Sequence, residues 1–290
     1  MQIIINIIYS ASLYSIVAIP IFIIYYLSKV INISLGASLT LCGYFFYTFS
    51  NNFNLNYISS AIFAIILSII IGILLESSIY HPIRRKTNNS FTSLIASLGM
   101  YIILQNIVSI IWGDNTKSIR FSEIETGYNI MGGFLTKTQF FTIICSTLVI
   151  ITIYMLFYKT TLGRNIRAIA SNKTLAKVFG LNSSKVFYMS IIICYVIISF
   201  SGILVGIEND LTPSLGFNIL IYALVSMIIG GIGSFLGLVG GAFILATSQH
   251  LGAYYIDSNW MDAIAYFILI IFLIWKPLGF SGQKHKKTEI

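Results

Sequence analysis

The run YISSAIFAIILSIIIGILLESSIY, residues 57–80, decides what kind of fold this chain adopts. It carries a single charged side chain, Glu76. A helix needs about 20 mainly apolar residues to cross the hydrocarbon core of a bilayer, so this run is long enough for one crossing. The whole chain has the same character, with 57% apolar residues, 9% charged residues and a mean hydropathy of +0.89. These values indicate an integral membrane protein and exclude an ordinary soluble domain.

Similar runs recur along the chain and predict an all-α, polytopic bundle. No charge occurs between Asp210 and Asp257, so this longer run is expected to hold two passes or broken half-helices. We therefore expect about nine membrane crossings, within a range of about 8–10, some of them by broken or re-entrant helices. A transmembrane β-barrel would show alternating segments of about ten residues, which these uniformly apolar runs are not. Without a Pro/Ser-rich or low-complexity linker, one domain over 1–290 is expected. The other candidate spans are 3–27, 31–50, 91–112, 139–158, 186–207 and 258–275.

The charge distribution predicts the orientation, because cytoplasmic loops are enriched in Lys and Arg. If the polar stretch 159–185 is cytoplasmic, alternation of the spans puts fourteen of the seventeen basic residues on that side and seven of the nine acids on the other. The expected location is a bacterial plasma (inner) membrane, with the N-terminus outside and the C-terminus in the cytoplasm. The net charge of +8 then reflects contact with anionic lipid and not nucleic-acid binding. The basic residues expected in the cytoplasm include Lys284, Lys286 and Lys287, and the charged residues expected outside include Arg120, Glu123 and Glu125.

No arrangement in the sequence predicts enzyme chemistry. The nucleotide-binding pattern GxxxxGK[ST] is absent, so ATP-driven work would need a separate subunit. His250 lies deep in an apolar run, and no serine stands at a recognisable spacing from it. The cysteines Cys42, Cys145 and Cys194 form no CxxC pair. We therefore predict no catalytic residue, no metal site and no cofactor.

Uncharged polar residues inside the apolar runs are the candidates for a transport pathway. Ion-coupled transporters carry ionisable residues in the membrane interior, whereas most charges here fall near the ends of the runs. Asn32 and Ser34, with Gly36, interrupt the start of a span, and broken helices mark transport sites. Gln105 and Asn106 have two open interpretations, a bond to a neighbouring helix or the lining of a passage. Close helix packing and a re-entrant hairpin are likewise both open for Gly230, Gly231 and Gly233.

Six strings, in order over nearly the whole chain, carry a family resemblance. They are SLYSIVAIPIFIIYYLSKVINISLG (12–36), YHPIRR (80–85), LIASLGMYIILQN (94–106), GRNIRAIASNKTLAKVFGLN (163–182), GGIGSFLG (230–237) and WKPLGFSG (275–282). With these strings the chain resembles the LivH-type permease subunit of branched-chain amino acid ABC importers. The resemblance implies a second permease subunit, an extracytoplasmic solute-binding protein and two ABC ATPase subunits as partners.

The resemblance also implies that the cytoplasmic coupling loop falls at about 159–185. Glycines at positions 163 and 180 permit sharp turns at its two ends. Where the family commonly has Glu and Asp, this chain has Ser171 and Asn172, and Gln249 stands where Glu is usual. One apolar face is expected from Ile166, Ile169, Ala170, Leu175, Val178 and Phe179. The predicted coupling residues are Gly163, Arg164, Arg167, Ala168, Ala176 and Gly180.

The sequence thus predicts a transport subunit that moves a branched-chain amino acid inward by alternating access. Closure of ATP-driven partners would push on the coupling loop and rock the helices around a midplane passage. Two alternatives remain open, a sister permease for urea, amides or a sugar, and a free-standing channel or facilitator. The predicted pathway residues are Asn32, Ser34, Gly36, Gln105, Asn106, Gly230, Gly231 and Gly233.

Overall fold

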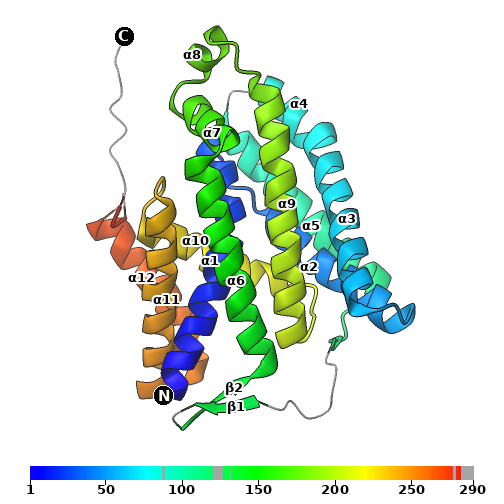
Figure 1. Ribbon diagram of the computed structural model, residues 1–290, viewed down its shortest axis with the longest axis vertical. Helices are drawn as coiled ribbons and strands as arrows, with labels where there is room; N and C mark the ends of the chain where they lie inside the picture. The colour runs from blue at the N-terminus through cyan, green and yellow to red at the C-terminus, as the bar shows by residue number, and fades with distance from the viewer. Residues whose placement is uncertain (87–88, 120–126, 131, 277–278, 282–290) are drawn as a thin grey trace.

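The computed structural model describes residues 1–86, 89–119, 127–130, 132–276 and 279–281 (Figure 1). Parts of the charge argument lie outside these residues, namely Arg120, Glu123, Glu125, Lys284, Lys286 and Lys287. The same holds for positions 277, 278 and 282 of the last family-like string.

Within the described residues, seven helices are long and apolar enough to cross a membrane. The all-α, polytopic membrane fold predicted from the apolar runs is confirmed. One of the seven is continuous over 57–86, because α3 (Tyr57–Leu75) passes through the π-helical segment η2 (Glu76–Tyr80) into α4 (His81–Lys86). Another consists of a short 3₁₀ turn, η3 (Ser258–Trp260), followed by α12 (Met261–Trp275). The other five are α1 (Gln2–Ser28), α5 (Ser90–Trp112), α6 (Lys137–Lys159), α9 (Ser183–Glu208) and α11 (Phe235–Tyr255).

Two shorter helices complete the bundle. Helix α2 (Ser34–Tyr47) is extended by a second π-helical segment, η1 (Thr48–Asn52). Helix α10 (Leu215–Gly230) has 16 residues, or about 24 Å at 1.5 Å per residue, which is less than the thickness of a hydrocarbon core. The long charge-free run therefore holds one short helix, α10, and one full-length helix, α11. Every one of the predicted segments contains a helix in the described chain.

A small β-hairpin, which the sequence did not lead us to expect, lies between α5 and α6. Its strands β1 (Gly127–Ile130) and β2 (Gly133–Thr136) pair antiparallel. The hairpin docks against the start of α1, where the Phe134 N–H donates to Gln2 Oε1 at 2.7 Å. Figure 1 shows the hairpin and the N-terminus together at one end of the bundle.

Helices α1 and α9 form the centre of the bundle, and α12 lies at its edge. In the most apolar window of α1 and of α9, 72% of the residues are buried, against 6% in α12. Aromatic side chains join α1 to its neighbours, since the Phe22 ring lies 5.6 Å from Phe157 of α6 and 6.1 Å from Phe235 of α11. The peripheral helices expose large apolar side chains, as expected of surfaces that face lipid or another membrane subunit.

Glycines bring several helix pairs into close contact. A Cβ atom on Gly36 of α2 would lie 2.9 Å from the carbonyl oxygen of Gly216 in α10. A Cβ on Gly237 of α11 would meet the backbone of Gly230 in α10. Small residues of this kind let membrane helices pack at short distance without a polar side chain between them.

The basic segments share one end of the bundle. Figure 1 shows α4, α7 (Thr161–Ser171) and α8 (Lys173–Val178) at the end opposite the N-terminus and the hairpin. Helix α4 carries Arg84, Arg85 and Lys86, and α7 and α8 carry most of the basic residues of 159–185. The two basic groups thus lie on the same side, as alternation of the spans requires.

Candidate functional site

The turn between α1 and α2 contains the first predicted pathway residues, and their polar groups bond one another. Asn32 Oδ1 accepts hydrogen bonds from the Ser34 N–H at 3.1 Å and from Ser34 Oγ at 2.7 Å. The hydroxyl of Tyr80, the last residue of η2, donates to Ser34 Oγ at 2.7 Å. Ser34 is buried and Asn32 is half-buried. A side chain from a distant helix therefore completes this small network.

Ser97 of α5 supports the same turn. Its Oγ accepts a hydrogen bond from the Ile33 N–H at 3.2 Å and donates one to the Leu94 carbonyl at 2.8 Å. Irregular backbone at membrane depth needs such partners because lipid supplies none. Neither Tyr80 nor Ser97 was among the predicted site residues. Both lie inside the family-like strings, but no sequence pattern distinguishes them from the other hydroxyl residues of the spans.

A narrow recess lies at this network, and part of its wall also lines a larger cavity. The recess has a volume of about 10 Å³, the space of a single water, and Asn32, Tyr80 and Ser97 form part of its wall. The larger cavity, of about 640 Å³, lies at the end of the bundle that carries α4 and α8. The two share Ser28, Val30, Arg84 and Ser93. The recess at Asn32 and the cavity at the basic end are thus neighbours that share part of their walls.

The amides of α5 lie apart from the Asn32 turn. Asn106 is exposed, and its Nδ2 donates to the Ile102 carbonyl of the same helix at 2.7 Å. Gln105 beside it is half-buried. The wall of the recess is formed from α5 by other residues, Ser93 and Ser97.

The predicted glycines Gly230, Gly231 and Gly233 form the turn between α10 and α11. Gly231 and Gly233 have positive φ angles of 106° and 126°, which a side chain would strain. The Phe280 N–H donates to the Ile229 carbonyl at 3.0 Å, so the segment after α12 covers this turn. The close contact of Gly230 with Gly237 agrees with the packing interpretation, and the tight turn between α10 and α11 agrees with the hairpin interpretation.

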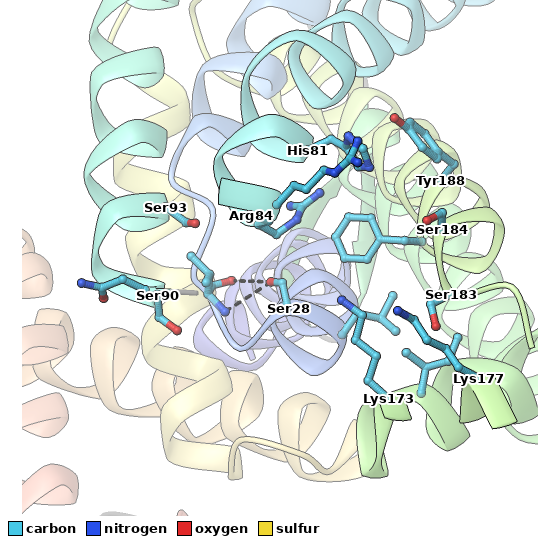
Figure 2. Close-up of a pocket in the computed structure, with 16 residues that line it drawn as sticks. Ser28, His81, Arg84, Ser90, Ser93, Lys173, Lys177, Ser183, Ser184 and Tyr188 are labelled. Atoms are coloured by element: carbon cyan, nitrogen blue, oxygen red, sulfur yellow. Dashed lines mark hydrogen bonds between the residues drawn. The ribbon is translucent and has the colours of Figure 1, made fainter. Parts of the chain in front are cut away.

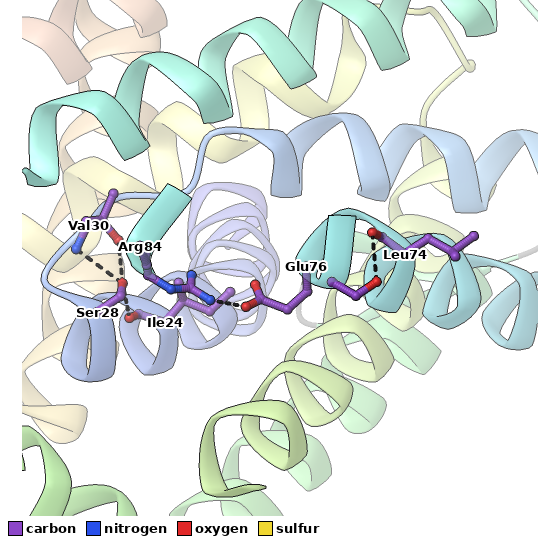
Figure 3. Close-up of polar contacts among 7 residues, drawn as sticks. Ile24, Ser28, Val30, Leu74, Glu76 and Arg84 are labelled. Atoms are coloured by element: carbon purple, nitrogen blue, oxygen red, sulfur yellow. Dashed lines mark hydrogen bonds and ion pairs between the residues drawn. The ribbon is translucent and has the colours of Figure 1, made fainter. Parts of the chain in front are cut away.

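Arg84 lines both the recess and the large cavity, and two contacts hold its side chain in place. Its guanidinium forms an ion pair with Glu76 (Figure 3) and lies 4.1 Å from the ring centroid of Phe187 in α9. The Glu76 side chain is only 3% exposed, whereas that of Arg84 is 26% exposed. The carboxylate therefore depends on Arg84 for its charge partner, and Arg84 retains access to the cavity.

Side-chain caps fix the helices of the 159–185 segment. Thr160 Oγ1 accepts from the Gly163 N–H at 3.2 Å at the start of α7. Asn172 Oδ1 accepts from the Thr174 and Leu175 N–H groups, both at 3.0 Å, at the start of α8. Such caps satisfy N–H groups that a helix leaves unpaired. Asn172, noted in the sequence as a departure from the family pattern, thus has a structural role.

The single apolar face predicted for this segment is wrong. Ile166 and Ile169 of α7 are buried against the bundle, whereas Val178 is 77% and Phe179 is 82% exposed. The reason is that α7 and α8 are separate short helices, so their apolar residues point in different directions. Leu175 is also exposed, and it extends the outward apolar surface of Val178 and Phe179.

The predicted coupling residues fall into two groups, those that attach the segment to the bundle and those that are exposed. Arg167 donates to the Phe157 carbonyl, and its guanidinium lies 5.3 Å from the ring centroid of Tyr158. A Cβ atom on Gly163 would collide with carbonyl oxygens of α6, and Ala176 is buried. These three residues attach the segment to the bundle. Arg164, Ala168 and Gly180 are exposed, and Gly180 has a φ of 79°.

A serine–histidine pair, which the sequence spacing did not reveal, lies toward the other end of the bundle. Ser10 Oγ of α1 is 2.8 Å from His250 Nε2 of α11. Nearby, the Tyr222 hydroxyl donates to Asp262 Oδ1, and the Tyr14 ring lies tilted against that of Tyr222, with the ring centroids 5.2 Å apart. Residues 240 positions apart meet here, so only the fold could bring them together. Asp262 bonds Tyr222, and among the described residues no carboxylate is found bonded to His250.

Comparison with known proteins connects this geometry to one family. The sequence model of the family described as branched-chain amino acid transport system / permease component matches residues 3–273. The high-affinity branched-chain amino acid transport system permease protein LivH of Salmonella typhimurium is 27% identical over 227 residues, which cover 76% of this chain and 72% of LivH. The galactose/methyl galactoside import permease protein MglC of the same organism is 31% identical over 209 residues, or 67% of this chain and 61% of MglC.

The fold also has a counterpart among solved structures. A chain of PsaBC from Streptococcus pneumoniae, solved in complex with Fab, superposes with a TM-score of 0.51. The match covers 94% of this chain and 91% of the other at 14% sequence identity. At that identity the likeness concerns the arrangement of the helices alone.

The Arg84–Glu76 pair generates a prediction about stability. Arg84→Gln leaves the buried Glu76 carboxylate unpaired, and we expect the free energy of unfolding to fall by about 3–5 kcal/mol. Glu76→Gln should cost less, because Arg84 keeps its exposure and its contact with Phe187. The double variant should recover part of the loss. Unfolding of the four proteins in detergent, followed by circular dichroism, tests this order. A larger cost for Glu76→Gln than for Arg84→Gln contradicts it.

Proposed function

Because the chain belongs to the family of branched-chain amino acid transport system permease components, we propose that it carries branched-chain amino acids inward as the membrane subunit of an ABC importer. The observation that carries this conclusion is the family match over residues 3–273, nearly the full length. Permeases of such importers work with ATPase subunits and a solute-binding protein. The absence of GxxxxGK[ST] from the whole sequence agrees with ATP hydrolysis by a separate subunit.

The passage for the substrate is proposed to include the turn at Asn32 and Ser34. Amide and hydroxyl groups there could hydrogen-bond the ammonium and carboxylate of an amino acid without adding net charge. The fold adds Tyr80 and Ser97 to this set through their bonds to the turn. The neighbouring side chains of Ile24 and Val30 supply apolar wall for an aliphatic substrate. Gly36 contributes the close contact with α10 that holds the start of α2 in place.

The 159–185 segment is proposed to be the coupling element for the ATPase. Leu175, Val178 and Phe179 present an outward apolar surface at the basic end of the bundle, and Arg164 lies exposed on the same segment. An apolar side chain that enters a partner's pocket commonly supplies a large share of binding energy. Gly163, Arg167 and Ala176 would transmit the displacement, since they fix the segment to α6 and the rest of the bundle. A second permease subunit would pack against the exposed faces of the peripheral helices.

Uptake by the reconstituted complex tests the function. Proteoliposomes that contain this chain, its partner permease, the ATPase subunits and the binding protein should accumulate labelled leucine only when ATP is present. Galactose and urea are the informative competitors, because one relative is a galactose permease and urea represents the alternative of a polar amide. Accumulation of galactose or urea without leucine would overturn the amino-acid assignment. Leucine entry that is independent of ATP would indicate a facilitator.

The outward apolar surface formed by Leu175, Val178 and Phe179 gives a second prediction. Phe179→Ser should weaken association with the ATPase subunits by about tenfold or more and lower ATP-dependent uptake in parallel. The fold should be unaffected, because Phe179 is 82% exposed and makes little contact within the chain. Phe179→Leu is the matched control, since it keeps an apolar side chain at the same place. If Phe179→Ser co-purifies with the ATPase as well as the wild type and Phe179→Leu do, the surface is not the docking site.

The proposed orientation places α8 in the cytoplasm and the segment after α5 outside. Asn115 and Thr174 are exposed at opposite ends of the bundle, and Cys42 and Cys194 are buried. In intact cells, a membrane-impermeant maleimide should therefore label Asn115→Cys and leave Thr174→Cys unlabelled. Both should react after the cells are permeabilised. Labelling of Thr174→Cys alone in intact cells would reverse the orientation.

A further inference from the structure

The large cavity at the basic end is built from four separate parts of the chain. The cavity has a volume of about 640 Å³. Its wall is formed by the end of α1, by α4 with the start of α5, by α7 and α8, and by the start of α9 (Figure 2). In Figure 2, Arg84 and His81 enter from one side, and Lys173 and Lys177 from the opposite side. The fold thus brings the two basic segments of the sequence to one concave site.

The cavity carries an excess of positive charge. Arg85, Lys173 and Lys177 line it, and its described wall contains no carboxylate. Glu76 compensates Arg84, which is held by the ion pair and by Phe187. Three cations therefore face one space without an acidic partner in that wall, which is an unfavourable arrangement unless an anion or bulk solvent screens them.

A buried hydroxyl in the cavity wall, that of Ser183, adds a donor without a hydrogen-bond partner among the described residues. The Ser183 side chain is 8% exposed. A buried hydroxyl left without a partner costs free energy, so the position favours a ligand atom that accepts a hydrogen bond. Ser183 and Lys177 both line the cavity, as do Ser184 and Ser90 (Figure 2).

From this geometry we propose that the cavity is a binding site for a phosphate-bearing anion, which lies beside the proposed amino-acid passage and shares Ser28, Val30, Arg84 and Ser93 with the recess at Asn32. A phosphate group offers several acceptor oxygens and more than one negative charge, which matches several cations and a free hydroxyl. An amino-acid zwitterion has no net charge and leaves the three cations uncompensated. The volume exceeds that of inorganic phosphate and admits a lipid headgroup or a soluble organic phosphate. Because Lys173 and Lys177 are on α8, the anion would join α8 to α4 and α9.

Binding to the full-length permease in nanodiscs tests the site, with two probes that represent the two sources. Phosphatidylglycerol, compared with phosphatidylcholine in native mass spectrometry, reports a headgroup. Pyrophosphate, titrated against thermal unfolding in phosphatidylcholine nanodiscs, reports a soluble anion. We expect Lys173→Gln with Lys177→Gln to weaken binding of at least one probe by about tenfold or more. Ser183→Ala should weaken the same probe by several-fold.

The matched control removes two charges from the same segment outside the cavity. Lys159→Gln with Lys185→Gln alters the net charge equally and should change binding by less than about twofold, since neither residue lines the cavity. An equal loss in both double variants would mean general surface attraction and would overturn the site. The proposal would also be overturned if the wild-type protein bound neither probe more tightly than the Lys173→Gln, Lys177→Gln variant does. These measurements need no ATPase and no transport, so their failure leaves the proposed importer function intact.

Discussion

The bilayer core offers the main chain no hydrogen-bond partner, and the rest of this structure depends on that constraint. Helices satisfy the backbone, and hydroxyl side chains inside them turn back to the carbonyl four residues earlier. Ser15 donates to Ala11 at 2.7 Å in α1, and Ser201 donates to Ile197 at 2.8 Å in α9. Such bonds let a buried helix carry polar residues without demanding a partner on its neighbours. Tyr80, at the end of a π-helical segment, instead reaches Ser34 of another helix.

Two interruptions of the helices lie next to the sites that concern function. Lys29 ends α1 with a left-handed φ of 56°, and the turn that follows contains Asn32. The π-helical segment η2 begins at Glu76 and ends at Tyr80, and α4, which contains Arg84, follows directly. A π-helical turn holds more residues than an α-helical turn, so side chains after it face a different direction from those of an uninterrupted helix. The Asn32 network and the Arg84 ion pair both use residues of this altered stretch.

The positions of the helices could be predicted from the sequence, because the length of an apolar run is a local property. The direction in which each side chain points could not, because most spans are apolar all round and show no preferred face. Asn106 illustrates the difference, since it lies in a correctly predicted helix and yet faces away from the bundle. Ser97 and the Ser10–His250 pair required long-range contacts that no spacing encodes. The hairpin at 127–136 is too short to produce a clear alternating pattern.

A continuous set of packed groups leads from the proposed coupling segment to the proposed passage. Ile166 of α7 belongs to the same buried cluster as Phe22 of α1 and Phe157 of α6. Arg167 adds a hydrogen bond to the Phe157 carbonyl, so α7 cannot shift without disturbing the end of α6. Phe22 lies in the last part of α1, which continues directly into the Asn32 turn. Close-packed interiors transmit displacement because they have little free volume to absorb it. A push on α8 would therefore reach the passage through α7 and α1, and an anion between Lys173, Lys177 and α4 would stiffen the same connection.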